Sequence, residues 1–320
     1  QGTNKVHGTP LDKEDISAIK EKLGVRDIPF TVSSDVMTNF QEMIHSRCDE
    51  IYQKEKKRKE KLPEEIKKEL EKLENIDLSL DDLTIDYEVP ESKAEAPRIT
   101  SGKILSSLSK NNPFLVGGCA DLSSSTKAYL EEAGDFSFQN PLGRNIFYGV
   151  REHAMGAISN GLALSGLHPF ASTFLTFSDY LKPAIRMSSL MNLGVTYIFT
   201  HDSLSIGEDG PTHQPVEQLI ALRSIPNLTV FRPCDANEII GTYKYIMNNP
   251  TGPTALILSR NEVPIQDSTS IHDVAKGGYI IRKERKNLSA IIIASGEEVQ
   301  IALEAASRLE EKGYDIRVIS

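Results

Sequence analysis

The sequence has few cysteines and no apolar run long enough to cross a bilayer. Its three cysteines, Cys48, Cys119 and Cys234, lie far apart and show no CxxC spacing. This argues against a disulfide framework and against a cysteine-ligated zinc site, and it fits a reducing compartment. No apolar run approaches the ~20 residues of a membrane-spanning helix, and no signal peptide is visible. We therefore expect a cytoplasmic protein without a membrane partner.

The chain also lacks an excess of basic residues. Its formal net charge is -9, which argues against nucleic acid and anionic membranes as partners. The densest run of lysines, residues 54–74, contains nearly as many glutamates and no aromatic residue. We interpret this run as a solvated helical segment with opposite charges at i,i+4 spacing. A local basic pocket for phosphorylated metabolites remains compatible with the overall charge.

No internal repeat or low-complexity tract is present, and three regions differ in composition. Residues 1–94 are polar and helix-prone, and residues 95–264 alternate between helices and short apolar strands. Residues 265–320 contain a linker and the first βαβ unit of another domain. The chain begins with Gln1 rather than Met, and residues 316–320 resemble a strand that has just begun. We therefore expect this sequence to be a piece of a longer polypeptide.

The alternation of elements predicts an α/β fold with a parallel sheet that is covered by helices on both faces. A helical N-terminal segment precedes this domain, and a truncated α/β domain follows it. The expected strands are residues 114–118, 145–150, 195–199, 228–231, 254–258, 288–294 and 315–320. The expected helices are residues 101–108, 152–164, 177–191, 216–223, 236–248 and 299–312.

The stretch 200–215 is the richest in chemically active side chains. It contains two imidazoles and three carboxylates, and it follows the buried strand at 195–199. Polar, glycine-rich loops at the carboxyl ends of strands are where open α/β sheets build sites. His201 and His213 could bind zinc, but the close histidine pair or Cys/His spacing of zinc sites is missing. Hydrogen bonding and proton transfer to a hydroxylated substrate fit these histidines better.

Two further segments carry candidate site residues. Glu152 begins a helix directly after a strand, which is ordinary helix capping. Its flanking residues are apolar, however, and a carboxyl group in such a setting can share a proton with a ligand nitrogen. Phe174, Phe177 and Tyr180 recur every third residue. Such a stripe is more often core than cofactor platform, but it begins at a strand-to-helix corner.

Anion-binding groups follow two other strands. Residues 117–125 combine a glycine turn with a hydroxyl cluster, which suits either an anion site or an ordinary capped turn. Arg260 ends the strand at 254–258, where a guanidinium group can bind phosphate through two hydrogen bonds. Arg98 and His7 could add to such a site, although each alone is a weak signal.

Together these segments resemble the transketolase family. The similarity rests on the motifs at residues 117–122, 148–152, 172–175, 200–203, 207–215, 231–235 and 256–260. Their order and spacing match over roughly residues 98–262, and more loosely over residues 7–10 and the final βαβ unit. The resemblance implies the thiamine diphosphate-binding fold, with residues 95–264 as the pyrimidine domain. It also implies transfer of a two-carbon ketol group from a ketose phosphate to an aldose phosphate, by a homodimer whose active site lies between subunits.

The resemblance assigns roles to individual residues. Glu152 corresponds to the carboxyl group that hydrogen-bonds the pyrimidine N1′ and thereby promotes deprotonation of the cofactor. Phe177, Phe174 and Tyr180 correspond to the aromatic wall of the pyrimidine pocket, and Asp121 and Leu122 to further cofactor contacts. The catalytic and substrate-binding set comprises His7, Arg98, Ser125, His201, Asp209, His213 and Arg260.

One departure concerns the metal. The family holds the diphosphate and a divalent metal, magnesium or calcium, with a Gly-Asp-Gly motif and a downstream Asn. The Gly-Asp-Gly motif is absent from these 320 residues, so we assign no metal ligand here. Residues 1–94 correspond to the tail of the diphosphate domain and a helical linker. We expect this piece alone to bind the cofactor weakly and to be inactive.

Other functions remain open. A related thiamine diphosphate enzyme of the dihydroxyacetone synthase or 1-deoxyxylulose-5-phosphate synthase type would share the fold. Arg98, Ser125 and Arg260 favour a phosphorylated acceptor, which argues against dihydroxyacetone synthase. The two-histidine loop argues against 1-deoxyxylulose-5-phosphate synthase. The alternative from another class is a non-catalytic half-enzyme subunit that binds a partner.

Overall fold

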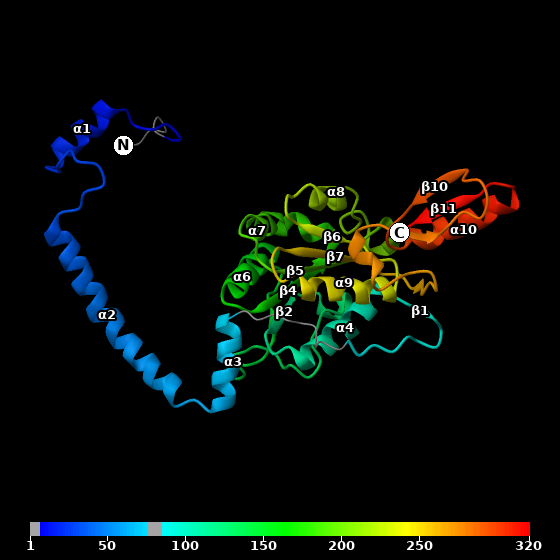
Figure 1. Ribbon diagram of the computed structural model, residues 1–320, viewed down its shortest axis with the longest axis horizontal. Coiled ribbons are helices and arrows are strands. Elements are labelled where there is room, and N and C mark those ends of the chain that lie inside the picture. The colour runs from blue at the N-terminus through cyan, green and yellow to red at the C-terminus, as the bar shows by residue number, and fades with distance from the viewer. Residues whose placement is uncertain (1–6, 76–84) are drawn as a thin grey trace. The chain divides into compact units, whose positions relative to one another are not determined.

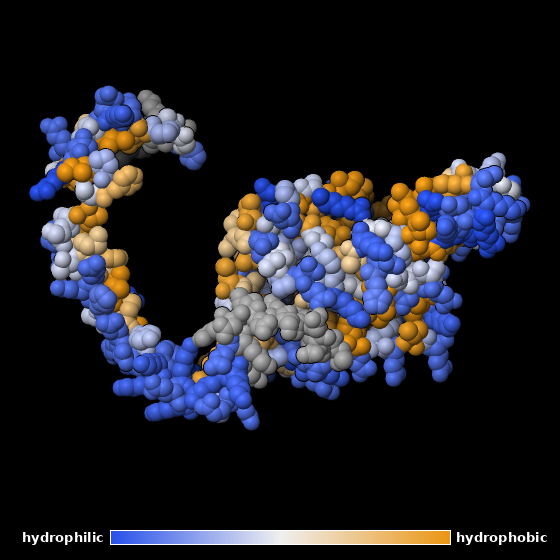
Figure 2. All heavy atoms as spheres, in the orientation of Figure 1, coloured by the Kyte–Doolittle hydropathy of each residue, from blue (hydrophilic) through white to orange (hydrophobic). Residues whose placement is uncertain are grey.

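The first unit of the chain is helical. The computed structural model describes residues 7–75 and 85–320, which divide into two units, Gln1–Glu71 and Lys72–Ser320. The first unit contains α1 (Lys13–Lys22), α2 (Ser34–Glu60) and most of α3 (Glu64–Asn75). None of the side chains of α1 or α2 is buried. The second half of α2 is strongly hydrophilic, whereas its first half carries interspersed apolar residues (Figure 2).

The charged run at residues 54–74 adopts the expected helical form. Lys54 Nζ lies 2.6 Å from a Glu50 carboxylate oxygen at i,i+4 spacing, and Lys67 Nζ lies 2.7 Å from Glu64 at i,i+3 spacing. Pro63 separates the two helices, because its ring cannot continue the preceding one. These pairs are exposed, so they keep the helices charged and solvated but contribute little stability.

The second unit is built on a parallel sheet of six strands, which confirms the predicted parallel sheet but includes a strand at His168–Phe174 that was not among those expected. The strand order is β3-β2-β4-β5-β7-β6, and every neighbouring pair is parallel. The strands are β2 (Leu115–Cys119), β3 (Asn145–Phe147), β4 (His168–Phe174), β5 (Thr196–Thr200), β6 (Thr229–Phe231) and β7 (Thr254–Leu258). Parallel sheets of this kind require helical crossovers that cover both faces.

Helices cover both faces of this sheet (Figure 1). One face packs against α4 (Pro97–Asn111) and α9 (Ala236–Asn248), through a core that includes Ile104, Phe170 and Tyr243. The opposite face packs against α6 (Glu152–Leu164), α7 (Ser178–Leu190) and α8 (Gln218–Arg223), through a core that includes Met155 and Tyr197. The short helix α5 (Ser123–Thr126) follows β2.

The close packing of α6 on α7 depends on a glycine. A Cβ atom added at Gly156 would lie 2.7 Å from both Ala184 Cβ and Leu181 Cδ1. Those distances are shorter than any normal van der Waals contact. The absence of a side chain at Gly156 therefore allows the two helices to approach this closely.

The last part of the second unit forms a smaller α/β layer. Strand β10 (Ala290–Ile293) pairs in parallel with β11 (Ile316–Ile319), and α10 (Glu298–Glu311) connects them. The strand β9 (Ile280–Arg282) pairs antiparallel with β11 and was not expected from the sequence. Val299, Ala306 and Val318 belong to the core of this layer.

Several predicted boundaries and one pattern were wrong. Helix α4 begins at Pro97 rather than residue 101, and β3 ends at Phe147 rather than residue 150. The aromatic stripe is not one helix, because Phe174 ends β4, Phe177 lies in the 3-10 helix η2 (Leu175–Phe177), and only Tyr180 lies in α7.

Two short strands were also not predicted from the sequence. Strands β1 (Ala94–Glu95) and β8 (Val263–Pro264) pair antiparallel, at positions where no strand was expected. The remaining 3-10 helices are η3 (Leu204–Asp209) and η4 (Asp273–Lys276). Within residues 7–75 and 85–320, no helix combines the length and the apolar character that crossing a membrane requires.

Candidate active site

The predicted site residues of the second unit cluster at the carboxyl ends of the sheet strands. The chain passes from β2 to the edge strand β3 and then returns to β4 on the other side of β2. Such a reversal of strand order opens a crevice at the carboxyl ends of the adjacent strands β2 and β4, where open α/β sheets bind ligands. The loops after β2, β4, β5 and β7 carry Asp121, Phe177, His201 and Arg260 to this edge.

Sheet register brings Phe174 and His201 together. Phe174 is paired with Thr200, and Thr200 is paired with Leu258 on the next strand. His201 therefore leaves the sheet beside Phe174, and the two rings stack with centroids 3.8 Å apart. His201 is only 3% exposed, and its φ of 59° lies in the left-handed region that a bulky side chain rarely adopts. Such strained backbone persists where surrounding packing holds it, often at functional sites.

His213 lies against the same aromatic residues. Its ring makes edge contacts with Phe177, at a centroid distance of 5.1 Å, and with Phe174, at 6.0 Å. The Phe177 ring also approaches Tyr180, at 6.1 Å, although Tyr180 itself is exposed. The expectation that these aromatic residues lie at a strand-to-helix corner is thus confirmed, and both histidines lie on that corner.

The histidines share a hydrogen-bond pattern that leaves one nitrogen for a ligand. Nδ1 of His201 lies 2.8 Å from the Thr200 hydroxyl, and Nδ1 of His213 lies 2.9 Å from the Thr212 hydroxyl. Neither Nε2 atom has a hydrogen-bond partner among the described residues. In the same part of the chain, no three His, Cys, Asp or Glu side chains are grouped as metal ligands. Each histidine therefore keeps one imidazole nitrogen for a hydrogen bond with a ligand.

Two guanidinium groups lie close to His201. Burial, followed by the positive charges of Arg98 and Arg260, lowers the pKa of His201 to about 4, while Asp209 acts in the opposite direction. Burial and the charge of Arg260 also lower the pKa of Arg98. Arg98 Nη1 donates to the carbonyl oxygen of Ser125 at 2.5 Å, and its buried Nε has no partner among the described residues. Two neighbouring cations without a carboxylate partner form a natural anion site.

Glu152 provides a buried carboxyl group at the start of α6. It is 7% exposed, and no described residue forms a hydrogen bond with its carboxylate. The preceding turn contains Gly149 with a φ of 65°, which lets the chain pass from β3 into the helix. Although the residue is mostly buried, its carboxylate oxygens still reach solvent. The group is therefore open to a ligand that the chain does not supply, such as a ring nitrogen.

The other predicted residues are placed less closely. Asp121 is exposed after β2 with a φ of 62°, Leu122 is partly buried, and Ser125 takes part through its backbone carbonyl. His7 lies at a turn in the first unit. The roles assigned to these four residues remain predictions.

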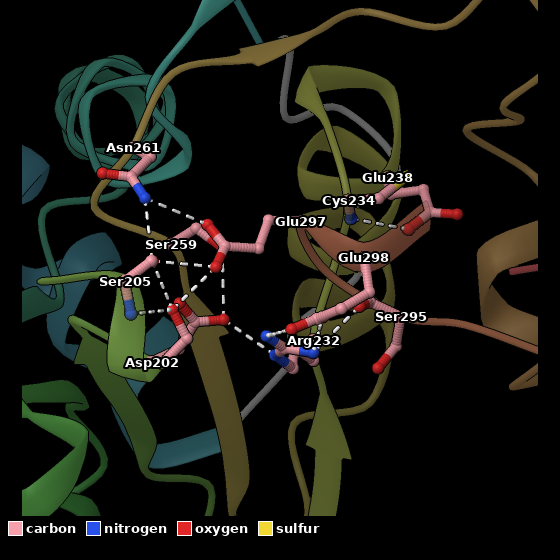
Figure 3. Close-up of polar contacts among 11 residues, drawn as sticks. Asp202, Ser205, Arg232, Cys234, Glu238, Ser259, Asn261, Ser295, Glu297 and Glu298 are labelled. Atoms are coloured by element: carbon pink, nitrogen blue, oxygen red, sulfur yellow. Dashed lines mark hydrogen bonds and ion pairs between the residues drawn. The ribbon is translucent and has the colours of Figure 1, made fainter. Parts of the chain in front are cut away.

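Sequence reasoning missed a polar network directly behind the site. Arg232, at the end of β6, bonds to Asp202 and to Glu298, and Glu297 bonds to Ser205 (Figure 3). The only signal in the sequence was Arg232 at a strand terminus, and its partners lie far away along the chain.

Three family models match consecutive parts of the chain. Residues 96–266 match the family model described as "Transketolase, pyrimidine binding domain". Residues 1–79 match "Transketolase, thiamine diphosphate binding domain", and residues 277–320 match "Transketolase-like TK C-terminal domain".

Individual relatives and structures agree with these matches. Transketolases of Bacillus subtilis and Aquifex aeolicus are each 43% identical to this chain and cover 100% of it. The chain spans about half of those relatives, 49% and 47% of their lengths. The solved transketolase of Campylobacter jejuni superposes with a TM-score of 0.85 at 38% identity, covering 100% of this chain and 50% of that one. Sequence, fold and site geometry together show that this chain belongs to the transketolase family.

Proposed function

We propose that the protein containing this chain is a transketolase of the pentose phosphate pathway. It moves a two-carbon ketol group from a ketose phosphate, such as xylulose 5-phosphate, to an aldose phosphate, such as ribose 5-phosphate. The observation that carries the proposal is the placement of two histidines, two aromatic rings and two arginines, which have no carboxylate partner among the described residues, at one edge of the sheet. Related structures support it, including that of a Pichia stipitis transketolase in complex with sedoheptulose-7-phosphate.

The residues present fit thiamine diphosphate. The unpaired carboxyl group of Glu152 is suited to hold a proton between its oxygen and a pyrimidine nitrogen. Phe174 and Phe177 stack with centroids 5.9 Å apart and offer a flat apolar wall. Tyr180, Asp121 and Leu122 complete the proposed cofactor contacts. When bound, thiamine diphosphate supplies the carbon nucleophile on which the two-carbon unit is carried.

The substrate is proposed to lie between the histidines and the arginines. Burial and positive charges keep His201 neutral at physiological pH, so it donates or accepts hydrogen bonds without adding charge. Arg98, His201 and Arg260 bind the sugar phosphate, assisted by Ser125, and Asp209 hydrogen-bonds a substrate hydroxyl. His213 and His7 are proposed to hydrogen-bond substrate oxygens and transfer protons.

The partners and setting of the protein are also part of the proposal. We propose a homodimer whose active sites lie between subunits, with magnesium or calcium bound by residues outside this chain. We retain the division into residues 1–94, 95–264 and 265–320. A cytoplasmic location is supported by three cysteines that are all free thiols.

A second candidate is a half-enzyme subunit that needs a separate partner chain. One solved structure, titled "Split gene transketolase, inactive beta4 tetramer", is 32% identical and has a TM-score of 0.57, covering 70% of each chain. That precedent concerns another protein, but it makes the split arrangement testable here. Activity should therefore be measured with and without the remainder of a transketolase diphosphate domain.

The proposal is tested by product analysis combined with a substitution at Glu152. With xylulose 5-phosphate and ribose 5-phosphate, the protein should form sedoheptulose 7-phosphate and glyceraldehyde 3-phosphate. Glu152→Gln should lower kcat by about 100-fold or more, because an amide cannot exchange the proton that the carboxyl group shares with the cofactor. Binding of sugar phosphates should persist. Failure to form sedoheptulose 7-phosphate would contradict the assignment, as would full activity of Glu152→Gln. Parallel assays with formaldehyde added as acceptor, or with pyruvate and glyceraldehyde 3-phosphate, would then detect dihydroxyacetone or deoxyxylulose phosphate formation.

A further inference from the structure

The start of α10 is tied to the two segments that carry His201 and Arg260. We call the four residues Asp202, Arg232, Glu297 and Glu298 the clamp (Figure 3). Glu297 and Glu298 come from the C-terminal layer, whereas Asp202 and Arg232 lie at the ends of β5 and β6. The clamp contains no residue of the proposed cofactor or substrate contacts.

The first half of the clamp is centred on Arg232. Its Nε donates to Asp202 Oδ2 at 2.7 Å, its Nη1 donates to the Ser295 carbonyl at 2.9 Å, and both terminal nitrogens contact the Glu298 carboxylate. The backbone amide of Gly296 donates to the Arg232 carbonyl at 2.9 Å. This planar group therefore uses several donors at once to join the pyrimidine domain to the C-terminal layer.

Close backbone approach keeps this connection rigid. Gly296 has a φ of 60°, and a Cβ atom there would lie 2.8 Å from the guanidinium carbon of Arg232. Only glycine allows the turn before α10 to approach the arginine this closely. The side chains of Arg232 and Asp202 are buried, at 8% and 1% exposure, so their pairing is little screened by solvent.

The second half of the clamp is centred on Glu297. Its Oε1 accepts hydrogen bonds from Ser203 Oγ at 2.7 Å and from Ser205 Oγ at 2.9 Å. Its Oε2 accepts from Asn261 Nδ2 at 3.3 Å, and the same amide nitrogen donates to Ser205 Oγ at 2.8 Å. One carboxylate thus bridges the loop after β5 and the segment after β7.

Asp202 of the clamp, and the residues that hydrogen-bond to the clamp, are direct sequence neighbours of the proposed substrate residues. Asp202 and Ser203 follow His201, and Ser259 and Asn261 flank Arg260. Ser259 Oγ also donates to Asp202 Oδ2 at 3.1 Å, which links the two segments to each other. Neither His201 nor Arg260 can shift far along the sheet edge without breaking these bonds.

We propose that Glu297 and Arg232 are positioning residues, through which the C-terminal layer sets the spacing of His201 and Arg260 for the substrate phosphate. This inference rests on the proposed function. It gives the C-terminal layer a role in recognising phosphorylated sugars, although none of its described residues is proposed to touch the sugar. A shift of about 1 Å in a positioning group can change turnover by up to two orders of magnitude.

The test compares two acceptors in the complete protein. Glu297→Ala should raise KM for ribose 5-phosphate by about tenfold, and it should change KM for the unphosphorylated acceptor glycolaldehyde by about twofold or less. The kcat with ribose 5-phosphate should stay within about threefold, because the cofactor contacts are untouched. Glu297→Gln should recover most of the loss, since its side-chain carbonyl still accepts hydrogen bonds from the two serines.

Arg282→Ala is the matched control. It removes an arginine that bonds to Glu310 and Ser307 within the same C-terminal layer, away from the clamp. This control should leave the ratio of the two KM values unchanged even if it lowers the melting temperature. Equal effects of Glu297→Ala and Arg282→Ala on that ratio would overturn the inference, as would an unchanged KM for ribose 5-phosphate. A wild-type protein without ketol transfer would instead refute the proposed function.

Discussion

His201 shows how one residue at the site is controlled by its surroundings. The backbone is held in the left-handed region, the ring stacks on Phe174, and two arginines lie near enough to affect its protonation. Each of these features disfavours the imidazolium form or fixes the ring. The residue is therefore a neutral hydrogen-bonding group whose protonation is coupled to folding.

The lowered pKa of His201 makes part of the folding stability depend on pH. Its pKa is about 4 in the folded chain, against about 6.5 in an unfolded one. The unfolded state therefore binds more protons between these values, and this contribution to stability is lost as the pH falls from 6.5 towards 4. From pH 7 to pH 4.5 we expect a loss of about 2 kcal/mol that His201→Asn does not show.

Equilibrium urea unfolding at both pH values, on the wild type and His201→Asn, measures this difference. Asparagine tolerates the left-handed backbone and does not titrate, so removal of the imidazole packing should change stability equally at the two pH values. The expectation fails if the two proteins lose the same stability on acidification.

Individual candidate site residues could be predicted only where a chemically active side chain comes soon after a strand in the sequence. Phe174, His201 and Arg260 lie at strand ends or just after them, and Glu152 begins the helix that follows β3; the alternation of elements predicts a ligand site at this edge. The partners of Arg232 were not predictable, since Glu298 belongs to another layer. Such contacts depend on how two layers pack, which local residue patterns do not encode.

At the scale of elements, α6 offers a comparison between two glycines in one helix. Gly156 faces α7 at contact distance, whereas an added Cβ at Gly161 would meet no atom within 4 Å. Gly156→Val should therefore lower the free energy of unfolding by about 1–3 kcal/mol through overpacking. Gly161→Ala should raise it by about 0.5–1 kcal/mol, because alanine favours the helix.

Thermal unfolding followed by circular dichroism tests this pair of substitutions. The two variants should shift the melting temperature in opposite directions. A similar shift for both would mean that helix propensity, rather than contact with α7, governs this surface.

Elements with strong local signals were predicted correctly from the sequence. Elements that depend on pairing between distant segments were not. The bounds of α6, α9 and β7 were predicted correctly, because each has a clear hydrophobic pattern between turn residues. Strands β1 and β8 have two residues each and exist only through pairing with each other. Phe174 was grouped with a helical stripe, but its parallel pairing with Thr200 makes it the end of a strand.

At the scale of the whole molecule, the sequence contains no Gly-Asp-Gly motif. We predict that the 320-residue chain by itself shows no ketol transfer, because family resemblance assigns the diphosphate and metal ligands to residues beyond it. Isothermal titration with thiamine diphosphate and magnesium should give a Kd at least about tenfold weaker than that of the complete protein. Transfer activity of the isolated chain would refute this prediction.

The three free cysteines differ in exposure, so a label can be attached selectively to the first unit. Cys119 and Cys234 are buried, and burial raises the pKa of the Cys119 thiol to about 11 and that of Cys234 further, whereas Cys48 is exposed on α2. Because thiolates react and thiols do not, a maleimide dye should modify the native chain once, at Cys48. Mass spectrometry of the intact labelled chain would verify a single adduct, and Cys48→Ser should abolish it. The chain thus offers a natural attachment point for a fluorophore that reports on the helical unit without any engineered cysteine.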